Sequence, residues 1–210
     1  MLIPSDNSSM THYDLIANRF ADTLQAVAEQ VDSLAPPIER AASLLSETLL
    51  QDGKLILCGL GPDAAAAQLM ASYLISRFDL ERPALPALNL AQGSSITTSV
   101  IGLSGSTDLF SRQIKALGRN EDLLICIANQ NSHPALLRAI QTAHDQGIPV
   151  VAITNAQLDD IDSLLTPGDV NIAIDAERNS TVMELQIMCI HRLLELLEES
   201  LFFTNTGTES

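Results

Sequence analysis

The stretch Lys54–Ala67, KLILCGLGPDAAAA, constrains the fold more than any other part of the chain. Its apolar run, Leu55–Cys58, predicts a buried strand that stops at the glycines Gly59 and Gly61. Pro62 suits the first turn of a helix, and the alanines after it predict a helix that lies close to a sheet. In α/β proteins, such a loop and the positive end of its helix commonly hold a ligand phosphate.

Strands and helices alternate along the rest of the chain. The other predicted strands are Leu85–Leu90, Leu123–Ile127, Pro149–Ile153 and Val170–Ile174. The predicted helices are Thr11–Ser33, Pro37–Leu50, Asp63–Arg77, Thr107–Leu117, Pro134–Asp145 and Ser180–Leu201, and the type of Thr97–Leu103 stays open. Pro36-Pro37 is expected to break the first helix from the second. This order predicts an α/β fold with a parallel sheet covered on both faces.

The 210 residues fit a single domain. We expect a disordered leader at 1–10, N-terminal helices over 11–51, an α/β core over 54–201 and a flexible tail at 204–210. The two leading helices and the last helix carry more apolar surface than one sheet face needs. That excess predicts an oligomer interface made of helices.

The charge of the chain limits its partners. With 26 acidic and 11 basic side chains, its formal charge of −15 argues against direct binding of nucleic acid and favours a basic protein partner. No apolar run is long enough to span a membrane, and the N-terminus lacks the features of a signal peptide. The odd set Cys58, Cys126 and Cys189, all in apolar runs, indicates free thiols and a cytoplasmic protein.

Two loops are expected at the carboxyl ends of neighbouring strands, where ligands bind in such folds. The first, Gly59–Asp63, has glycines but places the carboxylate of Asp63 where an anion would lie. The second loop offers the neutral side chains of Asn129, Gln130, Asn131 and Ser132. These side chains would bind a sugar hydroxyl or a weak anion, or they would only cap the helix that begins at Pro134.

Two histidines and the apolar C-terminal tip are further candidates. His133, beside the second loop, suits a general acid or base, or simply a surface position at a helix start. His191 has only Glu195 as a ligand-type neighbour on its helix face, which favours a structural or interface role over a metal site. Leu201-Phe202-Phe203 is either tucked into an oligomer or displayed for a partner.

Three further segments give the chain a family resemblance. They are ASYLISRFDLERPALPAL, FSRQIKALGRNEDLLICIANQNS and the long last helix. With the two leading helices and KLILCGLG, they resemble the phosphoheptose isomerase group of sugar isomerase (SIS) domains over Thr11–Phe202. The resemblance implies a three-layer, flavodoxin-like domain with five parallel strands, and a homotetramer. It also implies an activity that converts sedoheptulose 7-phosphate to a heptose phosphate.

The residues that the resemblance assigns to catalysis are mostly replaced. The group holds phosphate with a serine where Asp63 stands and with a serine-rich second loop where residues 128–133 stand. It holds zinc and moves protons with a histidine, a glutamate, a glutamine and a second histidine. Those positions read Leu69, Tyr73, Met183 and His191. The comparison predicts that isomerase chemistry is absent and that no zinc or other cofactor is bound.

A non-catalytic branch of the group, the DnaA-associating proteins, has similar segments around Arg77-Phe78 and Glu81-Arg82-Pro83 and a Leu-Phe pair like Leu201-Phe202. The first hypothesis is therefore a tetrameric tether for the replication initiator DnaA, with a weak phosphosugar site. The alternative is a phosphosugar isomerase with a rearranged site that uses His133 or His191. A third possibility is a phosphosugar sensor that binds without turnover.

Overall fold

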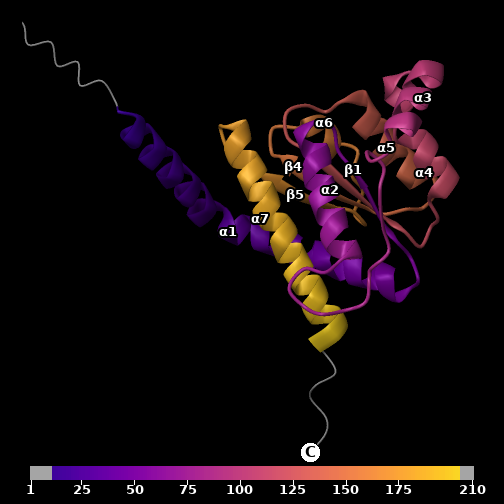
Figure 1. The fold of residues 1–210 in the computed structure, drawn as a ribbon, viewed down its shortest axis with the longest axis horizontal. Helices are drawn as coiled ribbons and strands as arrows, with labels where there is room; N and C mark the ends of the chain where they lie inside the picture. The colour runs from indigo at the N-terminus through magenta and orange to yellow at the C-terminus, as the bar shows by residue number, and fades with distance from the viewer. Residues whose placement is uncertain (1–10, 204–210) are drawn as a thin grey trace, which may run out of the picture.

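The computed structural model describes residues 11–203 (Figure 1). The predicted leader and tail lie outside these residues. Five parallel strands form one sheet in the order β2-β1-β3-β4-β5, which confirms the predicted fold class. The strands are β1 (Leu55–Cys58), β2 (Ala87–Asn89), β3 (Leu123–Ala128), β4 (Val150–Asn155) and β5 (Val170–Ile174). The helices are α1 (His12–Leu50), α2 (Pro62–Ile75), α3 (Ser94–Ser104), α4 (Ser111–Leu117), α5 (Pro134–Asp145), α6 (Asp159–Asp162) and α7 (Asn179–Glu198), with short turns η1 (Ser106–Asp108) and η2 (Glu199–Phe203).

Alternate residues of the central strands face two separate cores. Leu57 and Ile125 pack with α1, α2 and α7 on one face, while Ile56 and Leu124 pack with α4, α5 and α6 on the other. β1 and β3 are wholly buried, as the runs of apolar residues predict for central parallel strands. The three cysteines are free and buried within these cores, as predicted. Within residues 11–203, no helix has both the length and the hydropathy needed to cross a bilayer.

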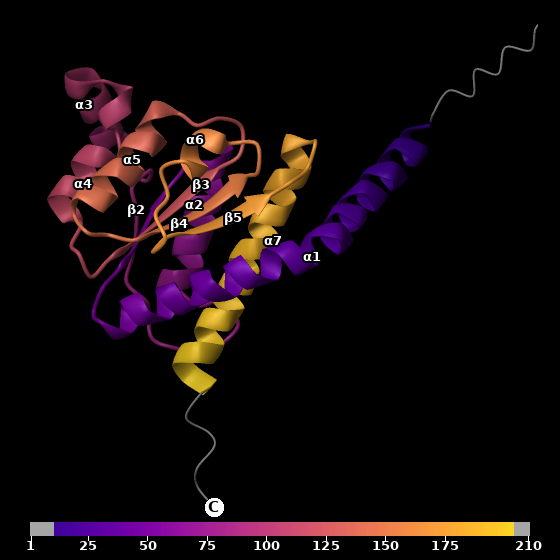
Figure 2. The ribbon, with the colours of Figure 1, turned by 180° about the vertical axis from the view of Figure 1, so that it is seen from behind.

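The first helix contradicts the predicted break at Pro36-Pro37. α1 runs through both prolines for 39 residues, and Figure 2 shows one continuous ribbon that bends along its length. A proline inside a helix costs about 3 kcal/mol because it removes a hydrogen bond and clashes with the preceding turn. Leu34 and Ile38, before and after the pair, are buried on the same core. Their burial against the sheet and α7 offsets that cost and keeps the helix continuous.

Gln30 of α1 fixes the helix to the segment that leads into α7. Its side-chain Nε2 donates to the carbonyl oxygen of Asp175 at 2.7 Å, and its Oε1 accepts from the Asp175 backbone N–H at 2.8 Å. Before this clamp, the N-terminal part of α1 projects away from the sheet and its covering helices (Figures 1 and 2). Ile16, Phe20 and Leu24 of this part are exposed, whereas Ala26 and Val27 pack partly against the core.

Two other segments settle points that the sequence left open or missed. The stretch around Thr97–Leu103 is helical, as α3, but buries none of its residues. The short helix α6 was not predicted, and only its Ile161 is buried.

Candidate functional site

The strand order reverses between β1 and β3, so the loops that leave their carboxyl ends form the crevice where ligands bind in this class of sheet. The first loop carries Gly59 and Gly61, and the second carries residues 129–133. A Cβ on Gly59 would lie 2.6 Å from the backbone of Asp63, so glycine is required for α2 to begin this close to β1. Gly61 has a φ of +57°, which favours glycine.

Asp63 joins the two loops. Its Oδ2 accepts a hydrogen bond from the backbone N–H of Asn129 at 3.0 Å, and its side chain is buried. Burial raises the pKa of Asp63, and the hydrogen bond from Asn129 opposes part of that rise. Within residues 11–203, its other oxygen, Oδ1, accepts no hydrogen bond. A buried carboxylate with a free oxygen at a ligand-binding edge is a candidate proton acceptor.

Asn129 connects the site to the start of α7. Its Nδ2 donates to the carbonyl oxygen of Asn179 at 2.8 Å. Its Oδ1 is buried and has no partner among the described residues. The backbone N–H and one amide N–H of Asn129 are thus in use, while its acceptor oxygen has no partner among the described residues.

The rest of the second loop has a mixed role. His133 caps α5, because its Nδ1 accepts a hydrogen bond from the Ala135 backbone N–H at 3.1 Å. The capping function predicted for this loop therefore falls to the histidine. Gln130 and Asn131 are exposed, and Ser132 is half-buried. With Nδ1 as the acceptor, a neutral His133 carries its proton on Nε2, which is left to donate to a ligand.

An amide cluster at the end of β2 was missed by the sequence analysis. Gln68 Oε1 accepts from Asn89 Nδ2 at 3.0 Å and from Gln92 Nε2 at 2.6 Å. β2 lies next to β1, so the cluster stands on the same edge as the two loops. The available signal was a polar residue at the end of a predicted strand, Asn89, inside the run Leu85–Leu90.

The positions that the resemblance assigns to zinc do not form a metal site. Tyr73, Phe78 and His191 form an aromatic cluster, with ring centroids 5.0 to 5.9 Å apart. His191 Nε2 is buried without a partner within residues 11–203. Leu69 has no ligand atom and Met183 only a thioether, and the described residues contain no group of three histidine, cysteine, aspartate or glutamate side chains fit for a metal. The residues present therefore do not fit zinc.

We expect the purified protein to contain far less than one zinc ion per chain, measured by mass spectrometry after dialysis against zinc, and to melt at the same temperature with and without a chelator. The matched variant Leu69→His with Tyr73→Glu and Met183→Gln supplies the missing ligands beside His191 and should gain zinc. Stoichiometric zinc in the natural protein would contradict the prediction.

The C-terminal tip is partly packed. Leu201 packs against the core, while Phe202 and Phe203 are 36% and 53% exposed. The tip is therefore neither fully tucked in nor fully displayed within one copy of the chain.

Comparison with known proteins extends these observations. The sequence profile of the SIS domain matches residues 19–155. The chain belongs to the SIS-domain family. It is 34% identical to the phosphoheptose isomerase of Colwellia psychrerythraea over 89% of this chain and 95% of that protein. It is 35% identical to the phosphoheptose isomerase of Thiobacillus denitrificans over 91% of this chain and 98% of that protein.

Solved structures agree. The phosphoheptose isomerase of Neisseria gonorrhoeae superposes with a TM-score of 0.85 at 28% identity, covering 90% of this chain and all of that one. The enzyme from Francisella tularensis gives 0.84 at 27% identity. These relatives are all named phosphoheptose isomerases, and this chain aligns with nearly the whole length of each. The hypothesis of a non-catalytic tether for DnaA is therefore wrong, and the comparisons do not support the inclination against an enzyme. The comparisons favour the alternative, a phosphosugar isomerase.

Proposed function

We propose that this SIS-domain protein is an isomerase of a ketoheptose phosphate such as sedoheptulose 7-phosphate. The observation that carries the proposal is the likeness to phosphoheptose isomerases, at 34–35% identity over about nine-tenths of the chain. The crevice between β1 and β3 supports it, because polar groups from three strand ends meet at this edge.

The second loop is where we place the phosphate group of the substrate. Ser132 and Asn131 supply neutral donors there, and the Nε2–H of His133 supplies another. The positive end of the 12-residue helix α5 begins at Pro134, next to these side chains. The first loop suits a phosphate less well because Asp63 brings a negative charge to it.

The sugar end of the substrate then faces the first loop. Conversion of a ketose to an aldose moves one proton from C1 to C2 and a second from the C1 hydroxyl to the C2 oxygen, and the first transfer requires a base near those carbons. Asp63 is the carboxylate of this edge, and its Oδ1 is free among the described residues. Its raised pKa makes the carboxylate a better proton acceptor near neutral pH. The step as proposed uses no metal.

We expect sedoheptulose 7-phosphate to be converted to an aldose phosphate, followed by mass spectrometry after chromatography. Asp63→Asn should lower kcat by a factor of about 100 or more, because it removes a general base. Asp160→Asn, an exposed aspartate of α6, is the matched control and should leave the rate unchanged. Binding of the sugar phosphate without turnover would overturn the proposed function, and equal rates for Asp63→Asn and the natural protein would overturn the assignment of the base.

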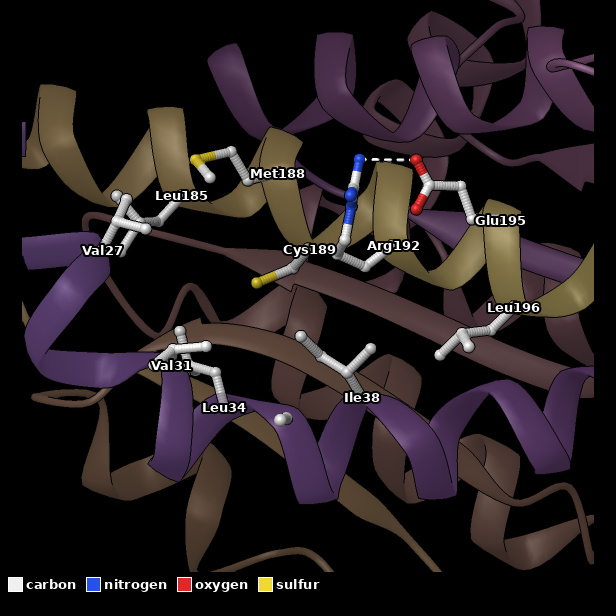
Figure 3. A pocket seen from close by; sticks show the side chains of 11 residues that line it. Val27, Val31, Leu34, Ile38, Leu185, Met188, Cys189, Arg192, Glu195 and Leu196 are labelled. Atoms are coloured by element: carbon white, nitrogen blue, oxygen red, sulfur yellow. Dashed lines mark ion pairs between the residues drawn. The ribbon is translucent and has the colours of Figure 1, made fainter. Parts of the chain in front are cut away.

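A second copy of the chain is the partner we propose for α1. Exposed apolar side chains recur along its projecting part at spacings of three and four residues. They are Tyr13, Ile16, Phe20 and Leu24. This stripe continues into a groove of about 340 Å³ between α1 and α7, lined by Val31, Leu34, Ile38, Leu185 and Cys189 among others (Figure 3). Helices in proteins gain most of their stability from packing of their apolar face, and a two-fold pairing would seat each stripe in the other copy's groove. Two such pairs would form the homotetramer that the family resemblance implies.

A further inference from the structure

The junction of the first and second loops holds two side-chain oxygens that accept no hydrogen bond within residues 11–203. The backbone N–H of Asn129 donates to Asp63 Oδ2 at 3.0 Å, and one N–H of its side-chain amide donates to the carbonyl oxygen of Asn179 at 2.8 Å. The two oxygens without a partner within residues 11–203 are Oδ1 of Asp63 and the buried Oδ1 of Asn129. Both are oxygens without a proton to give when Asp63 is ionised.

The shape of the loop is nevertheless that of an anion cradle. Gly59 lets the backbone of α2 approach β1, and Gly61 begins the helix without a side chain of its own. The carboxylate of Asp63 lies beside this loop, 8% exposed, and accepts a hydrogen bond from the backbone N–H of Asn129 in the second loop. The chain thus places a carboxylate at the junction of the two loops, next to a loop of the kind that usually binds a ligand anion.

We propose that Asp63 is a specificity-determining residue whose carboxylate excludes phosphate from the first loop and directs a hydroxyl-bearing part of the ligand to it. The free Oδ1 of Asp63 matches an O–H donor of a polyol, whereas an ionised phosphate brings mainly acceptors and negative charge. The proposal rests on the proposed function for the identity of the ligand. It fixes the direction of the ligand, with the phosphate on the second loop and the sugar on the first.

The test is a calorimetric titration with inorganic phosphate, which needs no turnover. Asp63→Ser and Asp63→Asn remove the charge, and Asn keeps the shape of the side chain. We expect both variants to bind phosphate at least about tenfold more tightly than the natural protein, since loss of one nearby like charge is worth at least a pKa unit of interaction. The control Asp160→Asn should bind as the natural protein does, and thermal melts should show that all four proteins are folded.

Unchanged or weaker phosphate binding in the two Asp63 variants would overturn the proposal, as would no measurable binding in any of the proteins. A parallel titration with unphosphorylated sedoheptulose should show the opposite order, with the natural protein binding best. The two proposals fail separately. Tighter phosphate binding by the variants without turnover of sedoheptulose 7-phosphate would keep the role of Asp63 and overturn the isomerase, and turnover without the phosphate effect would do the reverse.

Discussion

Replacing Glu198 by glutamine will lower the free energy of unfolding by about 3–5 kcal/mol, because it leaves a buried arginine without its charge partner. Glu198 and Arg82 are 3% and 1% exposed, and Arg82 Nε donates to Glu198 Oε1 at 2.6 Å. The same carboxylate accepts from the backbone N–H groups of Phe78, Asp79 and Leu80 at 3.0 to 3.3 Å. Chemical denaturation followed by circular dichroism measures the loss.

Arg82 extends this network to the end of α2. Its Nη1 donates to the carbonyl oxygen of Leu74 at 3.0 Å, and its Nη2 donates to that of Tyr73 at 2.9 Å. The pair therefore joins the last turn of α7, the end of α2 and the loop before β2. The matched control is Glu81→Gln, which breaks the exposed pair with Arg77 and should cost less than about 1 kcal/mol. Equal losses for the two variants would show that burial of the Glu198 pair does not set its contribution.

The effect of Glu198 should depend on pH in a defined direction. Burial alone would raise the pKa of Glu198, but the hydrogen bonds from Arg82 and from the three backbone N–H groups lower it below its usual value near 4.5. A carboxyl group with a lowered pKa in the folded state stabilises that state above its unfolded pKa. The stability difference between the natural protein and Glu198→Gln should therefore be constant above about pH 5 and shrink as the pH falls.

Phe20→Glu combined with Leu24→Glu will reduce the protein to a smaller assembly, because it puts two charges into the proposed contact between copies. Phe20 and Leu24 are 71% and 70% exposed in a single copy, so the substitutions cost little within it. Burial of two such side chains in a contact stabilises it by about 3–6 kcal/mol, which the variant loses. Light scattering after size exclusion gives the mass of each assembly.

The matched control places the same charges on the opposite side of the helix. Asn18→Glu with Gln25→Glu lies about half a turn away from the stripe of apolar residues and should keep the assembly of the natural protein. If the control and the test variant give the same mass, then the stripe on α1 is not the contact. Far-ultraviolet circular dichroism should show that both variants keep their helices.

The fold was predictable where the sequence pattern and the packing agree. Runs such as Leu123–Ile127 have no other place than a buried central strand, and the structure extends this one by a single residue, to Ala128. The predicted break at Pro36-Pro37 is wrong because the low helix propensity of proline is outweighed by the burial of Leu34 and Ile38. That burial depends on distant parts of the chain, which a local pattern does not show. α3 stayed open because its sequence has neither charges nor a buried face to set a period.

The candidate site was predictable to the level of its loops. Glycine-rich and polar segments after two strands indicate the edge where a ligand binds, and Asp63 could be singled out from its charge alone. The bond from Asn129 to Asp63 and the amide cluster around Gln68 depend on distances across the sheet edge, which no local pattern carries. The replacements at Leu69, Tyr73 and Met183 argue against isomerase activity. The 34% identity to a phosphoheptose isomerase over 89% of the chain favours it.

The placement of the two tyrosines gives this protein a built-in optical readout. The chain has no tryptophan, so its fluorescence beyond the weak emission of phenylalanine comes from Tyr13 and Tyr73. Tyr13 lies on the exposed stripe of α1, and Tyr73 lies against Phe78 and His191 near the buried end of α2. In Tyr13→Phe, the tyrosine signal comes only from Tyr73 in the aromatic cluster. In Tyr73→Phe, it comes only from Tyr13 on the apolar stripe of α1. Label-free fluorescence can therefore follow the association of copies and the unfolding of the domain as two separate events.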